Sequence, residues 1–202
     1  RREHRTAVIE MGANHLREIE LLTGLTQPDV GVITQAGDAH LEGFGSREGV
    51  ARGKGELFAG LPTHGIAVIN ADDTYADLWR GLAESHSKLT FGLSAQADVQ
   101  ARHVELLADS SRFVLTTPVG EHRVNLPLPG RHNISNALAA AACGVALGMD
   151  VEHITQGLAR VEGAAGRVTW KRTVQGARLL DDSYNAKPAS LRAGMELLAA
   201  LP

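Results

Sequence analysis

The sequence has little of several features that mark particular protein classes. It holds one cysteine in 202 residues, which excludes an intrachain disulfide and a zinc site built on several cysteines. Aromatic residues make up only 4%, whereas there are 22 glycines, a balance that favours a loop-rich α/β protein over a β-sandwich. Lysine and arginine (20) do not outnumber aspartate and glutamate (23), so the basic excess of a nucleic-acid-binding protein is missing.

Long apolar runs and an initiator methionine are also missing. No apolar run reaches the roughly 18–20 residues of a membrane-spanning helix, so we predict no membrane span. The chain opens with Arg1 and Arg2 and ends in Leu201-Pro202 directly after an apolar helical stretch, so we expect an interior piece of a longer protein. Its 44% hydrophobic and 21% charged residues are typical of a globular domain, and 202 residues suffice for one domain and part of another.

Strands alternate with helices in the first part of the chain. Short, continuously apolar runs predict strands over 6–11, 30–34 and 66–70, and helical spacing predicts helices over about 16–25 and 46–59. Continuous apolar strands that alternate with helices are typical of a parallel sheet covered on both faces. We therefore predict an α/β fold with helices on both faces of a parallel sheet.

The pattern changes after about Leu89. Runs with period-two character at 99–108, 112–117 and 122–128 predict a small antiparallel insert over about 90–128. An alanine-rich helix over 133–147, with Gly148 as its C-cap, and a helix over 151–161 follow. Beyond a glycine-rich hinge at 163–166, a strand over 178–182 and a helix over 190–201 have too little apolar surface to fold alone. We therefore predict one domain over 1–166 and the truncated start of a second over 167–202.

The ends of the first two predicted strands carry candidate metal ligands. Glu10 ends the first strand, His40 lies in the loop after the second, and Lys54 lies on the helix that follows. A carboxylate and an imidazole that meet at one sheet edge can hold a divalent metal ion. Spacing alone favours the plainer alternative, in which Glu10 forms a salt bridge and His40 lies in solvent.

Lys54 lies between two glycines, but its surroundings are not a P-loop. That motif needs glycine at position 48 and serine or threonine after the lysine, whereas the sequence has Glu48 and Gly55. A single lysine on a helix is usually a surface charge. The residues by themselves therefore leave Lys54 without an assigned role.

Two asparagines at the start of the alanine-rich helix are candidate purine contacts. Asn133 and Asn136 are three positions apart, so they share a face, and His132 precedes them. An amide offers a donor and an acceptor together to a purine edge. The alternative, an asparagine N-cap, explains one of the two residues but not both.

Two further residues, Asp182 and Arg167, have open alternatives. Asp182 follows a strand, where an acid binds ribose hydroxyls or a metal, but a turn or N-cap role is equally compatible. Arg167 lies past the hinge and can reach phosphates across an interdomain cleft, although a surface arginine is the default. We interpret Cys143 as helix packing, and Trp79 and Trp170 as structural.

Six stretches, taken in order, carry a resemblance to one family. The stretches are 8–15, 39–46, 53–56, 69–73, 128–133 with the alanine run after it, and 181–186. They resemble the ATP-dependent Mur ligases of peptidoglycan synthesis, and among these the branch that adds D-Ala-D-Ala to UDP-MurNAc-tripeptide. The resemblance covers nearly the whole chain, and it implies a P-loop-NTPase-like parallel sheet with an antiparallel appendage, followed by a Rossmann-like domain.

The resemblance implies a metal site. Glu10 would bind the Mg²⁺ that bridges the ATP phosphates, and His40 would bind a second Mg²⁺. Lys54 would be carbamylated by CO₂, which converts a cation into an oxygen ligand for that second ion. All three residues would then be catalytic.

The resemblance also implies contacts to the nucleotide and the substrates. Asn133 and Asn136, with His132 beside them, would contact adenine, Arg167 would contact the phosphates, and Asp182 the ribose. The substrate contacts would come from Asn14, His15, Tyr184 and Asn185. Lys187 departs from the family, which usually has asparagine there.

The resemblance implies amide bond formation in the synthesis of peptidoglycan. This reaction would contribute to the cell wall, and through it to cell shape and cell division. ATP would phosphorylate the carboxylate of UDP-MurNAc-tripeptide to an acyl phosphate, which the amine of D-Ala-D-Ala would attack. We expect a cytoplasmic monomer, and we expect these 202 residues alone to be inactive because the family's P-loop is not among them. The alternatives are another Mur or folylpolyglutamate-type ligase, or an inactive nucleotide-binding scaffold.

Overall fold

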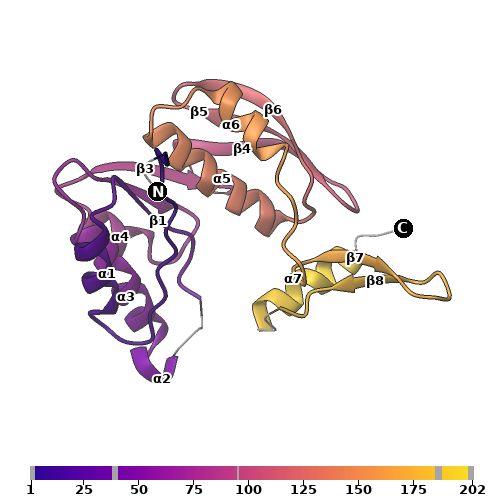
Figure 1. Cartoon of the computed structure of the whole chain (residues 1–202), viewed down its shortest axis with the longest axis horizontal. Helices are drawn as coiled ribbons and strands as arrows, with labels where there is room; N and C mark the ends of the chain where they lie inside the picture. The colour runs from indigo at the N-terminus through magenta and orange to yellow at the C-terminus, as the bar shows by residue number, and fades with distance from the viewer. Residues whose placement is uncertain (1–2, 38–40, 95, 185–187, 200–202) are drawn as a thin grey trace. The chain divides into compact units, whose positions relative to one another are not determined.

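The computed structural model describes residues 3–37, 41–94, 96–184 and 188–199. The chain divides into two compact units, Arg1–Leu89 and Thr90–Pro202 (Figure 1). The border between the units coincides with the change of pattern that the sequence shows after about Leu89.

The first unit alternates helices and strands around one core. Its elements are α1 (Glu18–Thr26), β1 (Val30–Ile33), α2 (Leu41–Phe44), α3 (Arg47–Ala59), β2 (Ile66–Asn70) and α4 (Ala76–Leu82). Strands β1 and β2 pair in parallel, with Val30 opposite Ile66 and Ile33 opposite Ile69. Helix α3 packs against both α1 and α4 (Figure 1). The core between these elements includes Phe58, which is fully buried.

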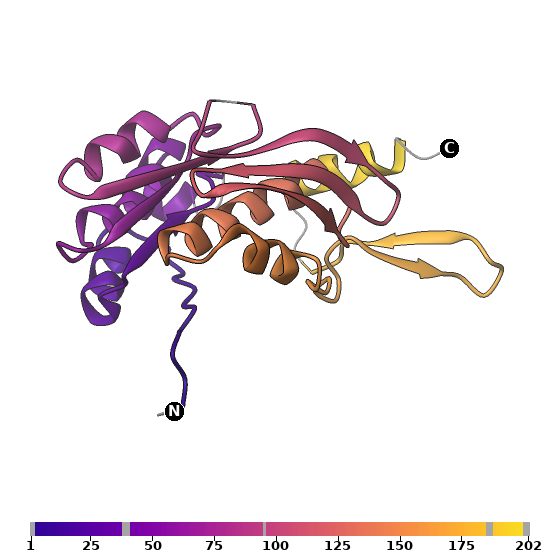
Figure 2. The same cartoon turned by 90° about the horizontal axis from the view of Figure 1, so that it is seen from above.

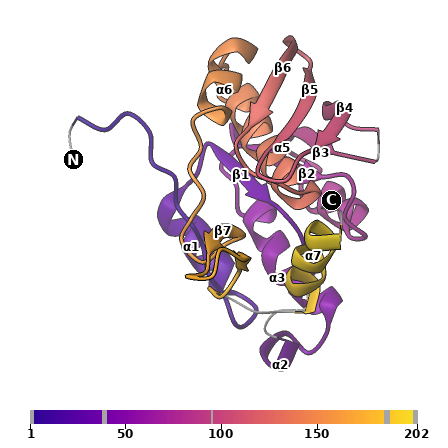
Figure 3. The ribbon, with the colours of Figure 1, turned by 90° about the vertical axis from the view of Figure 1, so that its right-hand side faces the viewer.

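The second unit is built on an antiparallel sheet. Strand β3 (Ser87–Gly92) leads into it and pairs in parallel with β4 (Val99–Leu106), which is followed by the antiparallel strands β5 (Ser111–Thr117) and β6 (Gly120–Leu126). Every second residue of β5, from Ser111 to Thr117, is buried. Helices α5 (Arg131–Ala146) and α6 (Val151–Leu158) cover that face of the sheet (Figures 2 and 3).

The chain ends in a hairpin and a helix. These are β7 (Thr169–Arg172), β8 (Arg178–Asp181) and α7 (Pro188–Ala199). Strands β7 and β8 form a two-stranded antiparallel sheet of their own, whereas β1 to β6 belong to one six-stranded sheet in chain order. The indole N–H of Trp170 donates to the carbonyl of Ala108 at 2.7 Å, and the guanidinium of Arg178 lies 4.5 Å from the indole ring. These contacts agree with a structural role for Trp170.

Helix α5 begins and ends at glycines with positive φ. Gly130 (φ 93) precedes it, and Gly148 (φ 76) follows its C-cap Leu147, so the predicted glycine stop is confirmed. Cys143 is half-buried on this helix, and burial raises the pKa of its thiol to about 11. Among the described residues, no helix combines the length and the apolar character needed to cross a bilayer.

The predicted α/β fold, a sheet flanked by helices with a small antiparallel insert, is confirmed. The strand predicted over 6–11 is wrong: this segment has no regular secondary structure (Figure 2). Val8 is 99% exposed and Ile9 57%, whereas Met11, at the end of the run, packs against the core of the first unit. A strand is stabilised by hydrogen bonds to a neighbouring strand, and residues 6–11 pair with none of the described strands. The sequence interpretation also omitted α2, α4, β3 and β7. The domain boundary at 166–167 and the Rossmann-like character of the last segment stay predictions.

Candidate functional site

Helix α3 holds Lys54 between two close packing contacts. The helix begins at Ser46, whose hydroxyl accepts the N–H of Gly49 at 3.0 Å. A Cβ at Gly53 would overlap the ring of Phe44, and one at Gly55 would overlap the side chain of Leu82. The two glycines therefore let α3 pack closely against α2 and α4, which explains the Gly-Lys-Gly sequence without a phosphate-binding loop.

The ammonium group of Lys54 lies at the carboxyl end of β1. Its Nζ donates to the carbonyl of Gln35 at 2.7 Å. The end of β2 holds the same loop: Asn70 donates to the carbonyl of Thr34 at 2.7 Å, and Asp73 accepts the N–H of Ala36 at 2.8 Å. Lys54 thus lies at the sheet edge where ligands of open α/β sheets bind.

The other two predicted metal ligands are Glu10 and His40. Glu10 is exposed and lies in the irregular segment that precedes α1, and His40 lies outside the described residues. Among the residues that the structure does describe, no three His, Cys, Asp or Glu side chains gather into a metal-binding cluster. This absence does not test the predicted metal site, because His40 is not among the described residues and Lys54 is not one of these four residue types. The metal site therefore stays a prediction.

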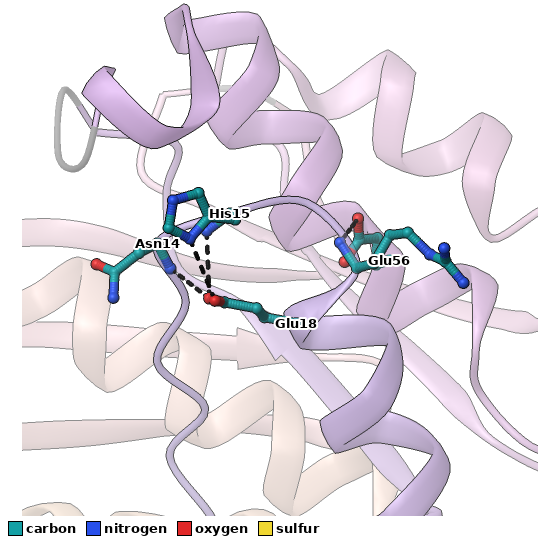
Figure 4. Close-up of polar contacts among 5 residues, drawn as sticks. Asn14, His15, Glu18 and Glu56 are labelled. Atoms are coloured by element: carbon teal, nitrogen blue, oxygen red, sulfur yellow. Dashed lines mark hydrogen bonds and ion pairs between the residues drawn. The ribbon is translucent and has the colours of Figure 1, made fainter.

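Asn14 and His15 lie in a turn that the carboxylate of Glu18 closes. Glu18 accepts the backbone N–H of Asn14 at 2.6 Å and that of His15 at 3.2 Å, and lies 3.3 Å from Nδ1 of His15 (Figure 4). These hydrogen bonds, led by that from the Asn14 amide, lower the pKa of the Glu18 carboxyl. Asn14 and His15 are both exposed, and the side-chain amide of Asn14 points away from Glu18 (Figure 4). The turn therefore leaves the side-chain amide of Asn14 exposed, while the ring of His15 contacts Glu18 through Nδ1.

The start of α5 presents the predicted adenine contacts. The N-cap is Gly130, without a side-chain cap, so the asparagine N-cap alternative is wrong. Asn133 instead donates from Nδ2 to the carbonyl of Pro129 at 2.8 Å. Asn133 is half-buried and Asn136, about one turn later, is exposed. Three positions separate the two asparagines in the first turns of the helix, and their contact with adenine stays a prediction.

His132 and Asp182 lie near enough to influence one another. Burial lowers the pKa of His132, while the carboxylate of Asp182 raises it. The guanidinium of Arg167 lies 4.4 Å from the ring centre of Tyr184, and the N–H of Tyr184 donates to the carbonyl of Gly166 at 3.0 Å. Among the predicted nucleotide and substrate residues of the second unit, His132 thus interacts with Asp182, and Arg167 contacts Tyr184. Asn185 and Lys187 lie outside the described residues.

We expect the imidazole of His132 to titrate below the ordinary histidine value of 6.5, because burial disfavours the charged ring. The contribution of His132 to stability is then present above pH 6.5 and is lost as the pH falls from there towards its folded pKa. Asp182→Asn should lower the pKa of His132 further, whereas the neighbouring Asp181→Asn should change it less. NMR titration of the imidazole resonances in the intact protein measures this, and a rise in Asp182→Asn would contradict it.

Comparison with known proteins decides the family. The family model for the Mur ligase middle domain matches residues 1–144. The chain belongs to the Mur ligase family. It is 43% identical, over 99% of its length, to the UDP-N-acetylmuramoyl-tripeptide–D-alanyl-D-alanine ligase of Escherichia coli, of which it covers 44%. This Mur ligase chain thus spans less than half the length of the curated relatives it matches.

Solved structures agree with this assignment. The crystal structure of MurF from Acinetobacter baumannii superposes on the whole Mur ligase chain with a TM-score of 0.94 at 40% identity, over 44% of its own length. MurF from Thermotoga maritima, solved in complex with ADP, matches 95% of the chain with a TM-score of 0.80 at 26% identity, over 44% of its own length.

Sequence reasoning missed several residues that build this part of the Mur ligase. Asn70 and Asp73 hold the loop after β1, and Glu18 and Glu56 hold the turn before α1. Asn70 and Asp73 stood in a stretch that carried the family resemblance, but no role was attached to them. The sequence signal for Glu56 was its place in the stretch 53–56 that carries the family resemblance.

Proposed function

We propose that this Mur ligase chain is the ATP-binding part of an enzyme that joins D-Ala-D-Ala to UDP-MurNAc-tripeptide. One observation carries the proposal: 43% identity over 99% of the chain to a ligase with that name. The match to MurF structures at a TM-score of 0.94 supports it. A reaction that uses ATP and a nucleotide-linked precursor fits the cytoplasm, and we propose a monomer there.

The nucleotide would bind along the second unit. His132 is half-buried and its lowered pKa favours a neutral ring, which suits contact with a flat, uncharged base. Asn133 and Asn136 would add amide hydrogen bonds to the adenine edge. Asp182 would bind the ribose, and Arg167, held over the ring of Tyr184, would reach the phosphates. The ADP bound to the Thermotoga maritima relative supports a nucleotide at this fold.

The donor set proposed for the metal fits Mg²⁺ only if Lys54 is carbamylated. An ammonium group has no lone pair for a metal, whereas Mg²⁺ prefers oxygen ligands. Attack of the neutral Nζ on CO₂ forms an N–C bond, releases a proton and leaves a carboxylate-like group. Glu10, His40 and the modified Lys54 would then hold the two ions. Bound Mg²⁺ supplies charge neutralisation for the transferring phosphoryl group.

The proposed reaction forms an amide in two steps. The γ-phosphoryl group of ATP passes to the terminal carboxylate of the tripeptide, and the amine of D-Ala-D-Ala then displaces phosphate. The described residues would bind and orient the reactants: Arg167 the phosphates, Asn14 and His15 the peptide substrates with Tyr184. Holding the reactants in place lowers the entropic part of the barrier.

Phosphate release by the full-length enzyme that contains these 202 residues, called the intact protein here, tests the proposal. With ATP and UDP-MurNAc-tripeptide, we expect D-Ala-D-Ala to support release, and meso-diaminopimelate, D-Glu and L-Ala, each supplied with its own UDP-MurNAc acceptor, to support none. Release with another amine alone would assign a sister ligase instead. Binding of ATP without release for any amine would identify an inactive scaffold.

A further inference from the structure

Helix α1 lacks an N-cap side chain of its own, and Glu56 of α3 replaces it. The N-cap residue Arg17 has a positive φ of 73° and no side-chain cap hydrogen bond. Glu56 accepts the N–H of Arg17 with Oε1 at 2.7 Å (Figure 4). Its Oε2 accepts the N–H of Glu20 at 3.2 Å. The first turn of a helix needs acceptors for its free N–H groups. Here that acceptor comes from a different helix.

The turn before α1 is held by a second carboxylate and by a close backbone contact. Glu18 accepts the N–H groups of Asn14 and His15. A Cβ at Gly43, on α2, would overlap the backbone oxygen of Asn14, so this helix touches the turn directly. Two carboxylates thus bind four backbone N–H groups between positions 14 and 20. Both hydrogen bonds to Glu56 tie this segment to the helix that carries Lys54, in addition to the packing of α1 against that helix.

We propose that Glu56 is a positioning residue that fixes Asn14 and His15 relative to helix α3, and that it thereby sets the affinity for the amine substrate. The proposal rests on the function proposed above, in which these side chains contact substrate. Lys54 and Glu56 are two residues apart, so they leave α3 on opposite sides. Loss of the Glu56 bonds should therefore disturb the turn more than the position of Lys54.

Steady-state kinetics of the intact ligase test this role. We expect Glu56→Ala to raise the KM for D-Ala-D-Ala by about tenfold, the size of effect for a lost charge-assisted hydrogen bond, with kcat and the KM for ATP little changed. Glu56→Gln keeps one acceptor oxygen and should recover part of the affinity. Glu48→Gln is the matched control, because Glu48 is an exposed carboxylate on the same helix that pairs with Arg52.

A merely structural role predicts a different pattern. Partial unfolding would lower the apparent kcat and leave every KM unchanged, and that result would overturn the proposal. An equal rise in the KM for ATP would do the same. If Glu56 acts through Asn14, Glu56→Ala and Asn14→Ala combined should cost little more than either alone, whereas additive losses would contradict it.

Hydrogen exchange separates this proposal from the assigned reaction. In Glu56→Ala the amides of Arg17 and Glu20 should exchange faster than in the unmodified protein, whichever amine the enzyme uses. Unchanged exchange would overturn the positioning role even if D-Ala-D-Ala is the substrate. Faster exchange with no D-Ala-D-Ala activity in the unmodified protein would overturn the proposed reaction, and with it the substrate part of this proposal.

Discussion

Replacement of Lys54 by alanine is expected to lower the kcat of the intact ligase by about 10²- to 10³-fold, the typical loss when one electrostatic stabiliser of a transition state is removed. Helix α3 directs the Nζ of Lys54 to the carboxyl end of β1, where it donates to the carbonyl of Gln35 at 2.7 Å. The proposed carbamate would itself be the metal ligand at this position, and alanine has no group that can form one. Phosphate release at saturating substrates measures the effect.

Variants distinguish a carbamate from a simple cation at position 54. Lys54→Arg keeps the positive charge but offers no amine for CO₂, so it should be as inactive as Lys54→Ala. Acetate or another short carboxylic acid should restore part of the activity of Lys54→Ala, and the unmodified protein should show a mass increase of one CO₂ on Lys54. Full activity in Lys54→Arg would refute the carbamate. Arg52→Ala is the matched control, an exposed cation on the same helix.

Local patterns along the sequence were enough to predict most of the elements around Lys54. The continuous apolar runs at 30–34 and 66–70 predicted β1 and β2, because strands buried on both faces have no polar side. Ser46 predicted the start of α3, because its hydroxyl can accept an N–H of the first turn. Both features depend on residues that are close in the chain.

The contacts that hold the site together could not be predicted in this way. Glu56 binds the amide of Arg17 across 39 positions, and Asn70 binds the carbonyl of Thr34 across 36. Hydrogen bonds between distant segments have no sequence period, so pattern analysis does not detect them. The strand predicted over 6–11 failed for a related reason, since an apolar run forms a strand only where a neighbour pairs with it.

The largest loss of stability is expected from Trp79→Ala, about 3–5 kcal/mol, the usual cost of truncating a fully buried tryptophan. Trp79 has no exposed surface, and its indole N–H donates to the carbonyl of Ala51 on α3 at 2.9 Å. The ring also lies beside Gly55, next to Lys54 on the same helix. The substitution would therefore leave a cavity between α4 and α3. Native-state hydrogen exchange of the α3 amides measures the loss as a lower free energy of opening.

Two further variants identify the cause of that loss. Trp79→Phe keeps most of the buried volume but removes the indole N–H, so it should cost less than Trp79→Ala. Trp170→Ala removes an indole that also donates to a backbone carbonyl, that of Ala108, but this ring is only half-buried. It should therefore cost less than Trp79→Ala and leave the α3 amides unaffected. Equal losses from Trp79→Phe and Trp79→Ala would show that the hydrogen bond, not the filled volume, stabilises α3.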